Sequence, residues 1–156
     1  IFTIYLPEVT DGRMVKPVEK KKVEMVGGTE RILLIEDEIS IGEIGSDLLK
    51  DLGYSIEVAY NGREAIQKLT TARQPFDLII LDMNMPRMGG RVTFERIKEL
   101  FPTVKVLVCS GYSTAMIEDG KFTQSIDGFI QKPFEIDEFA QKVRKVLDSV
   151  PVSSMS

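Results

Sequence analysis

Residues Leu78–Gly90 read LIILDMNMPRMGG, a sequence in which an apolar run is followed directly by a polar turn. An apolar run ends abruptly at one acid, Asp82, and Pro86 and Gly89-Gly90 then favour a turn. Such a run is typical of a buried strand. A carboxylate at the end of a buried strand costs free energy unless a partner or ligand there binds it. Asp82 is therefore the first candidate functional residue.

Three further apolar runs of strand length also end in polar side chains. They supply an acid pair, a hydroxyl group and an ammonium group: Glu36-Asp37 after Ile32–Ile35, Ser110 after Val104–Cys109, and Lys132 shortly after Gly128–Ile130. With Ser55–Ala59, the chain contains five predicted strands.

Helix-like stretches alternate with these strands, because apolar residues recur in them every three or four positions. Ser40 and Asn61 are candidate N-caps, since each has a glutamate in the turn that follows. The predicted helices are Ile41–Leu52, Arg63–Ala72, Arg91–Leu100, Ser113–Lys121 and Ile136–Val150.

Alternating strands and helices predict an α/β fold with a parallel sheet covered on both faces. A closed barrel of eight such units needs about 250 residues, so five units favour an open, doubly wound (βα)5 sheet. Such sheets bind ligands beyond the carboxyl ends of their strands, which is where the polar residues lie.

Composition limits the classes of function. A net charge of −4 over 156 residues argues against nucleic-acid binding. The absence of histidine excludes imidazole catalysis and His-ligated zinc within this chain, and a single cysteine, Cys109, excludes an intramolecular disulfide. No apolar run is long enough to span a membrane, so we expect no membrane contact by this segment and a cytoplasmic location.

The predicted strand ends would gather three carboxylates, those of Glu36, Asp37 and Asp82. Carboxylates that lie close together repel one another, and oxygen ligands without histidine or thiolate suit Mg²⁺. Lys132 and Ser110 complement an anion with several oxygens, which together with a metal indicates a phosphoryl-transfer site. Asp82 is the candidate nucleophile, and Asn84 could offer a backbone carbonyl to the metal.

Residues 31–149 closely resemble the receiver domain of two-component response regulators. Five ordered blocks carry the resemblance: Leu33–Glu38, Ala59–Gly62, Leu81–Pro86, Ser110–Tyr112 and Gln131–Phe134. The resemblance implies a flavodoxin-like strand order, 2-1-3-4-5. It also implies that Asp82 accepts phosphoryl from a phosphohistidine, that Glu36 and Asp37 hold Mg²⁺ with Asp82 and the Asn84 carbonyl, and that Ser110 and Lys132 bind phosphoryl oxygens. Ser110 and Phe129 would form the conformational switch.

Residues 2–7, FTIYLP, resemble the last strand of the ATP-binding domain of sensor histidine kinases. We therefore assign residues 1–6 to the remnant of the last strand of such a domain. The segment 7–29 has the composition of a linker, which places a receiver domain at 30–150 and a tail at 151–156. This order suggests the C-terminal receiver of a bacterial hybrid histidine kinase, a class of parent protein compatible with a membrane anchor. Its expected partners are a phosphohistidine domain, in the same chain or in another protein, and a histidine phosphotransfer protein.

Two other functions fit parts of the pattern. An aspartyl-phosphate phosphatase commonly places a second acid two residues after its nucleophile, but this chain has Asn84 there. An interaction module that is never phosphorylated would keep the fold, although the intact acids and Lys132 argue against it.

Overall fold

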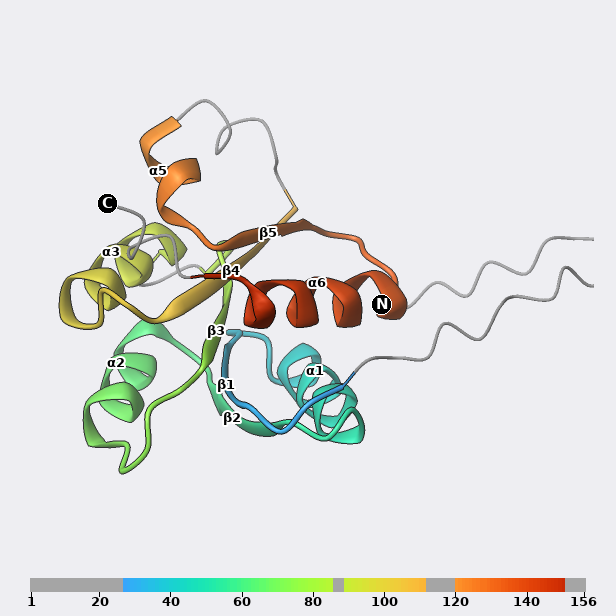
Figure 1. Ribbon diagram of the computed structural model, residues 1–156. Coiled ribbons are helices and arrows are strands. Elements are labelled where there is room, and N and C mark those ends of the chain that lie inside the picture. Colours follow the sequence, from blue (N-terminus) through green and yellow to red (C-terminus); the bar gives the residue numbers. More distant parts are fainter. Residues whose placement is uncertain (1–26, 86–88, 112–119, 151–156) are drawn as a thin grey trace, which may run out of the picture.

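The computed structural model describes residues 27–85, 89–111 and 120–150. In these residues five strands alternate with five helices (Figure 1). The strands are β1 (Arg31–Ile35), β2 (Ser55–Ala59), β3 (Leu78–Asp82), β4 (Lys105–Ser110) and β5 (Gly128–Gln131). The helices are α1 (Ile39–Asp51), α2 (Gly62–Thr71), α3 (Gly90–Leu100), α5 (Gly120–Ser125) and α6 (Ile136–Asp148).

All five strands are parallel and form one sheet in the order β2-β1-β3-β4-β5. This confirms the open (βα)5 sheet and the order that the resemblance implied. The chain runs from β1 to one side and then returns to place β3 on the other side. The carboxyl ends of β1 and β3 therefore flank the point where the strand order reverses, which is where open α/β sheets bind ligands.

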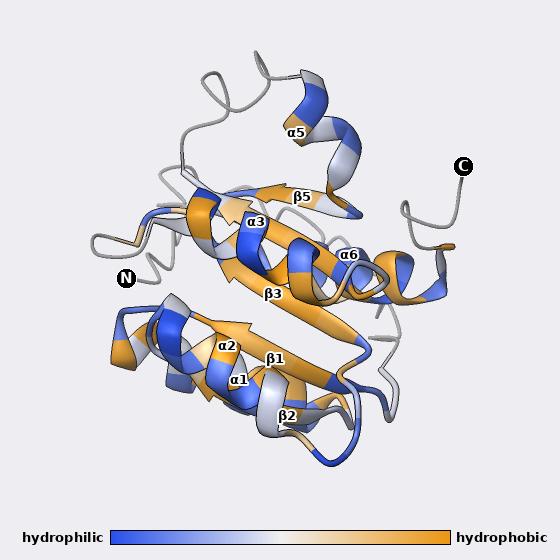
Figure 2. Ribbon diagram, turned by 90° about the vertical axis from the view of Figure 1, so that its left-hand side faces the viewer, coloured by the Kyte–Doolittle hydropathy of each residue, from blue (hydrophilic) through white to orange (hydrophobic). Residues whose placement is uncertain are grey.

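Helices cover both faces of the sheet (Figure 1). Successive strand residues point to opposite faces, so Leu33 and Ile35 pack with α2, α3 and α5, whereas Ile32 and Leu34 pack with α1 and α6. Figure 2 shows that the inner strands β1 and β3 are mostly hydrophobic, as burial on both faces requires. The central strand, β3, is buried at every position.

The two candidate N-caps behave differently. Asn61 caps α2, because its side-chain oxygen accepts a hydrogen bond of 2.8 Å from the Glu64 amide. Ser40 does not cap α1, so this prediction was wrong: α1 begins at Ile39, and Ser40 lies in its first turn. Just before the helix, the Glu36 carboxylate accepts a hydrogen bond of 3.2 Å from the backbone amide of Glu38. The side chain that binds a backbone amide at this helix start is therefore that of Glu36 and not that of Ser40.

The predicted helix Ser113–Lys121 lies mostly outside the described residues. The described helix α5 includes Gly120 and Lys121 and continues to Ser125, beyond the predicted end. Phe122 explains the extension, since its buried ring packs edge-to-face on Phe94 of α3, with ring centroids 4.9 Å apart. Within the described part of the chain, no helix is long and apolar enough to cross a membrane.

Candidate functional site

Backbone hydrogen bonds continue the sheet pairing just beyond the carboxyl ends of the strands and fix these ends relative to one another. The Glu36 amide donates to the Ala59 carbonyl at 3.0 Å, and the Lys132 amide donates to the Ser110 carbonyl at 2.8 Å. Glu36 directly follows β1 and Lys132 directly follows β5, while Asp82 and Ser110 are the last residues of β3 and β4. These four predicted site residues therefore lie together at the edge formed by the carboxyl ends of the strands, which we call the carboxyl edge.

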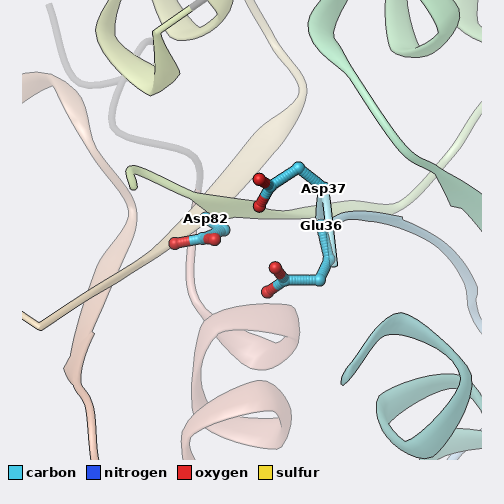
Figure 3. Close-up of side chains that lie close together, drawn as sticks. All are labelled: Glu36, Asp37 and Asp82. Atoms are coloured by element: carbon cyan, nitrogen blue, oxygen red, sulfur yellow. The ribbon is translucent and has the colours of Figure 1, made fainter. Parts of the chain in front are cut away.

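Three carboxylates meet at this edge. Figure 3 shows the side chains of Glu36, Asp37 and Asp82 converging from two neighbouring strand ends. One carboxylate oxygen from each lies within 4.8 Å of the others. Glu36 and Asp82 are each only 5% exposed, so water screens their charges poorly.

A single lysine reaches into this acid cluster. Lys132 Nζ lies 3.2 Å from Glu36 Oε2 and 3.5 Å from Asp82 Oδ1. Burial lowers the pKa of the lysine, but the carboxylates of Asp82 and Glu36 outweigh that effect and raise it. The ammonium group therefore stays charged and bridges two of the three acids.

The lysine does not neutralise the whole cluster. Burial, followed by repulsion from Asp82, raises the pKa of Glu36 to about 7, although Lys132 opposes this shift. Three acids face one ammonium group, so the edge carries unbalanced negative charge. A divalent cation would remove that imbalance, and a cluster of carboxylate oxygens without nitrogen or sulfur ligands suits a hard cation. The residues present therefore fit a metal ion of this class.

The loop after β3 fixes the Asp82 carboxylate. The backbone amide of Asn84 donates to Asp82 Oδ1 at 3.1 Å, which orients the Asp82 side chain at the strand end. The first residue of α3, Gly90, packs against this loop so closely that a Cβ atom there would lie 2.4 Å from the Met83 Cα. The sequence indicates a helix start at Gly89-Gly90, but it does not show that the helix must touch the Asp82 loop.

Ser110 and Phe129 lie on neighbouring strands and share one face of the sheet. Phe129 is the register partner of Val108, and Ser110 lies two residues beyond Val108. Ser110 is buried, and the half-buried Phe129 packs against the core beneath α2, α3 and α5. The geometry brings these two residues to one region, while their role as a switch stays a prediction.

The thiol of Cys109 and the peptide bond after Lys132 also lie close to the site. Cys109 is buried, which raises the pKa of its thiol to about 12, so it behaves as the small hydrophobic residue that the sequence predicts. The Lys132-Pro133 peptide bond is cis.

The sequence matches the family model described as "Response regulator receiver domain" over residues 32–144. The chain belongs to this family. It therefore has the fold of a two-component signalling receiver, and its acid cluster matches the phosphorylation site of such domains. Receiver domains interact with histidine kinases and phosphotransfer proteins.

Individual proteins agree with this assignment. The chain is 32% identical over 119 residues to sporulation initiation phosphotransferase F of Bacillus subtilis, covering 76% of this chain and 94% of that protein. It is 31% identical to the response regulator TrrA of Thermotoga maritima, solved in complex with Mg(2+)-BeF, with a TM-score of 0.67 and coverage of 76% and 99%.

A third relative is matched over more of this chain. Sensor kinase CckA of Brucella abortus is 28% identical over 154 residues, covering 94% of this chain but 16% of the kinase. Transcriptional regulatory proteins are also relatives, and the chain spans between 26% and 59% of those compared. The chain thus corresponds to one part of these longer relatives.

Proposed function

We propose that Asp82 accepts a phosphoryl group from a phosphohistidine. One observation carries the proposal: the Asp82 carboxylate is buried among two further acids, with a lysine ammonium 3.5 Å away. An acid in these surroundings has a nucleophilic oxygen and a positive charge close to where phosphoryl oxygens would lie.

The proposed transfer exchanges one bond for another. An Asp82 carboxylate oxygen attacks phosphorus, the phosphorus–nitrogen bond breaks, and its electron pair stays on the imidazole nitrogen, which takes a proton from water. Lys132 and Ser110 bind the phosphoryl oxygens. The ammonium group of Lys132 then moves away from Glu36 and pairs with the new phosphoryl group. Asn84 follows two residues after Asp82 where a phosphatase commonly has an acid, so we expect slow hydrolysis and a long-lived switch.

Mg²⁺ would be held by Glu36, Asp37, Asp82 and the Asn84 backbone carbonyl. When bound, it supplies positive charge that reduces the repulsion between carboxylate and phosphoryl oxygens. Ser110, once drawn toward the phosphoryl group, would change the packing on the face of the sheet that it shares with Phe129, and Phe129 would repack. Because Phe129 has no hydroxyl group, this movement depends on packing alone.

Phosphorylation with a small donor tests the proposal. We expect acetyl phosphate and Mg²⁺ to add one phosphoryl group to the wild type, measured by intact-mass spectrometry, and none to Asp82→Ala. Asp47→Ala removes an exposed aspartate of α1 and is the matched control, which should be labelled like the wild type. Chelation of Mg²⁺ should abolish labelling. Equal labelling of Asp82→Ala and the wild type would overturn the assignment of Asp82.

The parent protein is proposed to be a hybrid histidine kinase that works in the cytoplasm. The match to sensor kinase CckA supports this, because coverage of 94% of the chain must include most of the residues before Glu30. The phosphoryl donor would then be a phosphohistidine domain, in the same chain or in another protein, and a histidine phosphotransfer protein would receive the group. The upstream reading frame provides the test, since it should encode an ATP-binding domain that ends in the FTIYLP segment.

A further inference from the structure

The residues that lead into β1 are attached to two helices. We call Gly27–Glu30 the incoming segment. The Gly28 amide donates to the Leu52 carbonyl at the end of α1 at 3.1 Å, and Arg144 of α6 donates to the Gly27 carbonyl at 3.4 Å. The sequence assigns Gly27 and Gly28 to a linker, yet both make hydrogen bonds to the domain.

We call the contact between the incoming segment and helices α1 and α6 the joint. Arg144 provides most of the polar contacts in this joint. Its guanidinium group makes a two-pronged pair with Glu30, at 2.7 and 3.1 Å, and a second one with Asp148, at 2.7 and 3.1 Å. Its side chain is only 17% exposed. The pKa of Glu30 lies below its usual value because its carboxylate accepts these hydrogen bonds from Arg144. Two-pronged pairs of this kind fix orientation as well as adding energy.

The incoming segment also lies unusually close to α1. A Cβ atom on Gly27 would sit 1.9 Å from the Leu52 carbonyl oxygen, so only glycine allows this approach. The close approach and the Arg144 contacts hold the segment from two sides. The chain that precedes Gly27 therefore joins the domain at a fixed point.

The other end of α6 is connected to the phosphoryl site. Lys132 contacts Asp82, and Phe134, two residues further on, stacks on Phe139 of α6 with ring centroids 5.0 Å apart and planes 14° apart. Phe139 and Val143 are buried against the sheet. A continuous series of contacts thus runs from Asp82 along α6 to the incoming segment, and packed side chains of this kind are one route by which distant sites are coupled.

We propose that Arg144 joins α6 to the incoming segment, so that filling the phosphoryl site changes how firmly the preceding chain is held. The coupling rests on the proposed function, because it needs Asp82 to take the phosphoryl group. By linkage, an event that moves the preceding chain would also change the affinity of the site for its ligand.

Amide hydrogen exchange of the full chain, followed by NMR, tests the joint. The Gly28 amide should exchange at least tenfold faster in Arg144→Gln than in the wild type, while amides of β1 and β3 keep their protection. Lys145→Gln removes one charge from an exposed position of the same helix and should behave like the wild type. If Arg144→Gln fails to fold, Glu30→Gln removes the other side of the pair and should accelerate Gly28 exchange in the same direction.

Adding Mg²⁺ and beryllofluoride, a phosphoryl mimic, tests the coupling. The Asn84 amide, which donates to Asp82, reports occupation of the site, and Gly28 exchange should then change at least threefold in the wild type but not in Arg144→Gln. Unchanged Gly28 exchange while Asn84 responds would overturn the inference alone, as would equal Gly28 exchange in Arg144→Gln and wild type. A silent Asn84 amide would overturn the proposed function, and the coupling would fall with it.

Discussion

At the carboxyl edge of the sheet Lys132 faces Glu36 and Asp82, and at the amino edge Arg144 faces Glu30 and Asp148. In each of these two groups, one cation lies between two acids. The outcomes differ: the pKa of Glu36 is raised to about 7, whereas the pKa of Glu30 is lowered.

Burial and the charge of Asp82 explain the difference. At the carboxyl edge, Glu36 and Asp82 are almost fully buried, and repulsion from Asp82 adds to the effect of burial on the pKa of Glu36. At the amino edge, Asp148 is exposed and the planar guanidinium group satisfies both carboxylates. An acid cluster that its own cation cannot balance points to a ligand, while a balanced cluster points to a structural joint.

The largest expected effect comes from the backbone beneath the unbalanced edge. Gly90→Ala should lower the free energy of unfolding by about 2–3 kcal/mol, because its Cβ would meet the Met83 and Asp82 backbone. Gly89→Ala is the matched control, since a Cβ there meets nothing within 4 Å, and it should change stability little. Urea unfolding measures both. Equal losses would mean that close packing on the Asp82 loop does not shape this edge.

Most of the fold and of the carboxyl edge could be predicted from the sequence. Apolar runs such as Leu78–Leu81 indicate strands, and parallel strands must end at the same edge of the sheet. The pattern alone therefore predicts that Asp82, Glu36 and Lys132 lie close together. Asn61 could be predicted as a cap because capping needs only local contacts.

The amino edge could not be predicted in the same way. Arg144 and Glu30 are 114 positions apart, and each looks like an ordinary surface charge in the sequence. The predicted end of α5 was wrong for the same reason, because Phe122 packs on Phe94 of another helix. The Ser40 prediction was wrong for a local reason, since the Glu36 carboxylate accepts a hydrogen bond from the Glu38 amide just before α1. Pairings made only by tertiary packing leave no periodic signal.

Glu36→Gln removes one carboxylate from the unbalanced edge and should therefore change its dependence on pH. The folded pKa of about 7 exceeds the usual 4.5, so the folded state favours the protonated acid. That contribution is complete below pH 4.5 and is lost as the pH rises through 7. At pH 8 without Mg²⁺, Glu36→Gln should therefore be more stable than the wild type by about 2 kcal/mol.

The measurement is urea unfolding between pH 6 and pH 8 with a chelator present. The wild type should lose stability across this range, and Glu36→Gln should change less. Mg²⁺ should stabilise the wild type and have a weaker effect on the variant, because the variant lacks one metal ligand. A variant that is less stable than the wild type at pH 8 would show that the carboxyl edge is already balanced.

Glu30→Gln is expected to have the smallest effect and the opposite sign. The folded pKa of Glu30 is lowered, so its contribution is present above its usual pKa of 4.5 and is lost as the pH falls below that value. At pH 8 the variant should be less stable by about 0.5–1 kcal/mol, since the pair is partly exposed. Glu138→Gln, at an exposed position of α6, is the charge-matched control. Acid unfolding of the variant should depend less on pH than that of the wild type. If instead Glu30→Gln were stabilising at pH 8, both edges would carry unbalanced negative charge, and the contrast between site and joint would no longer hold.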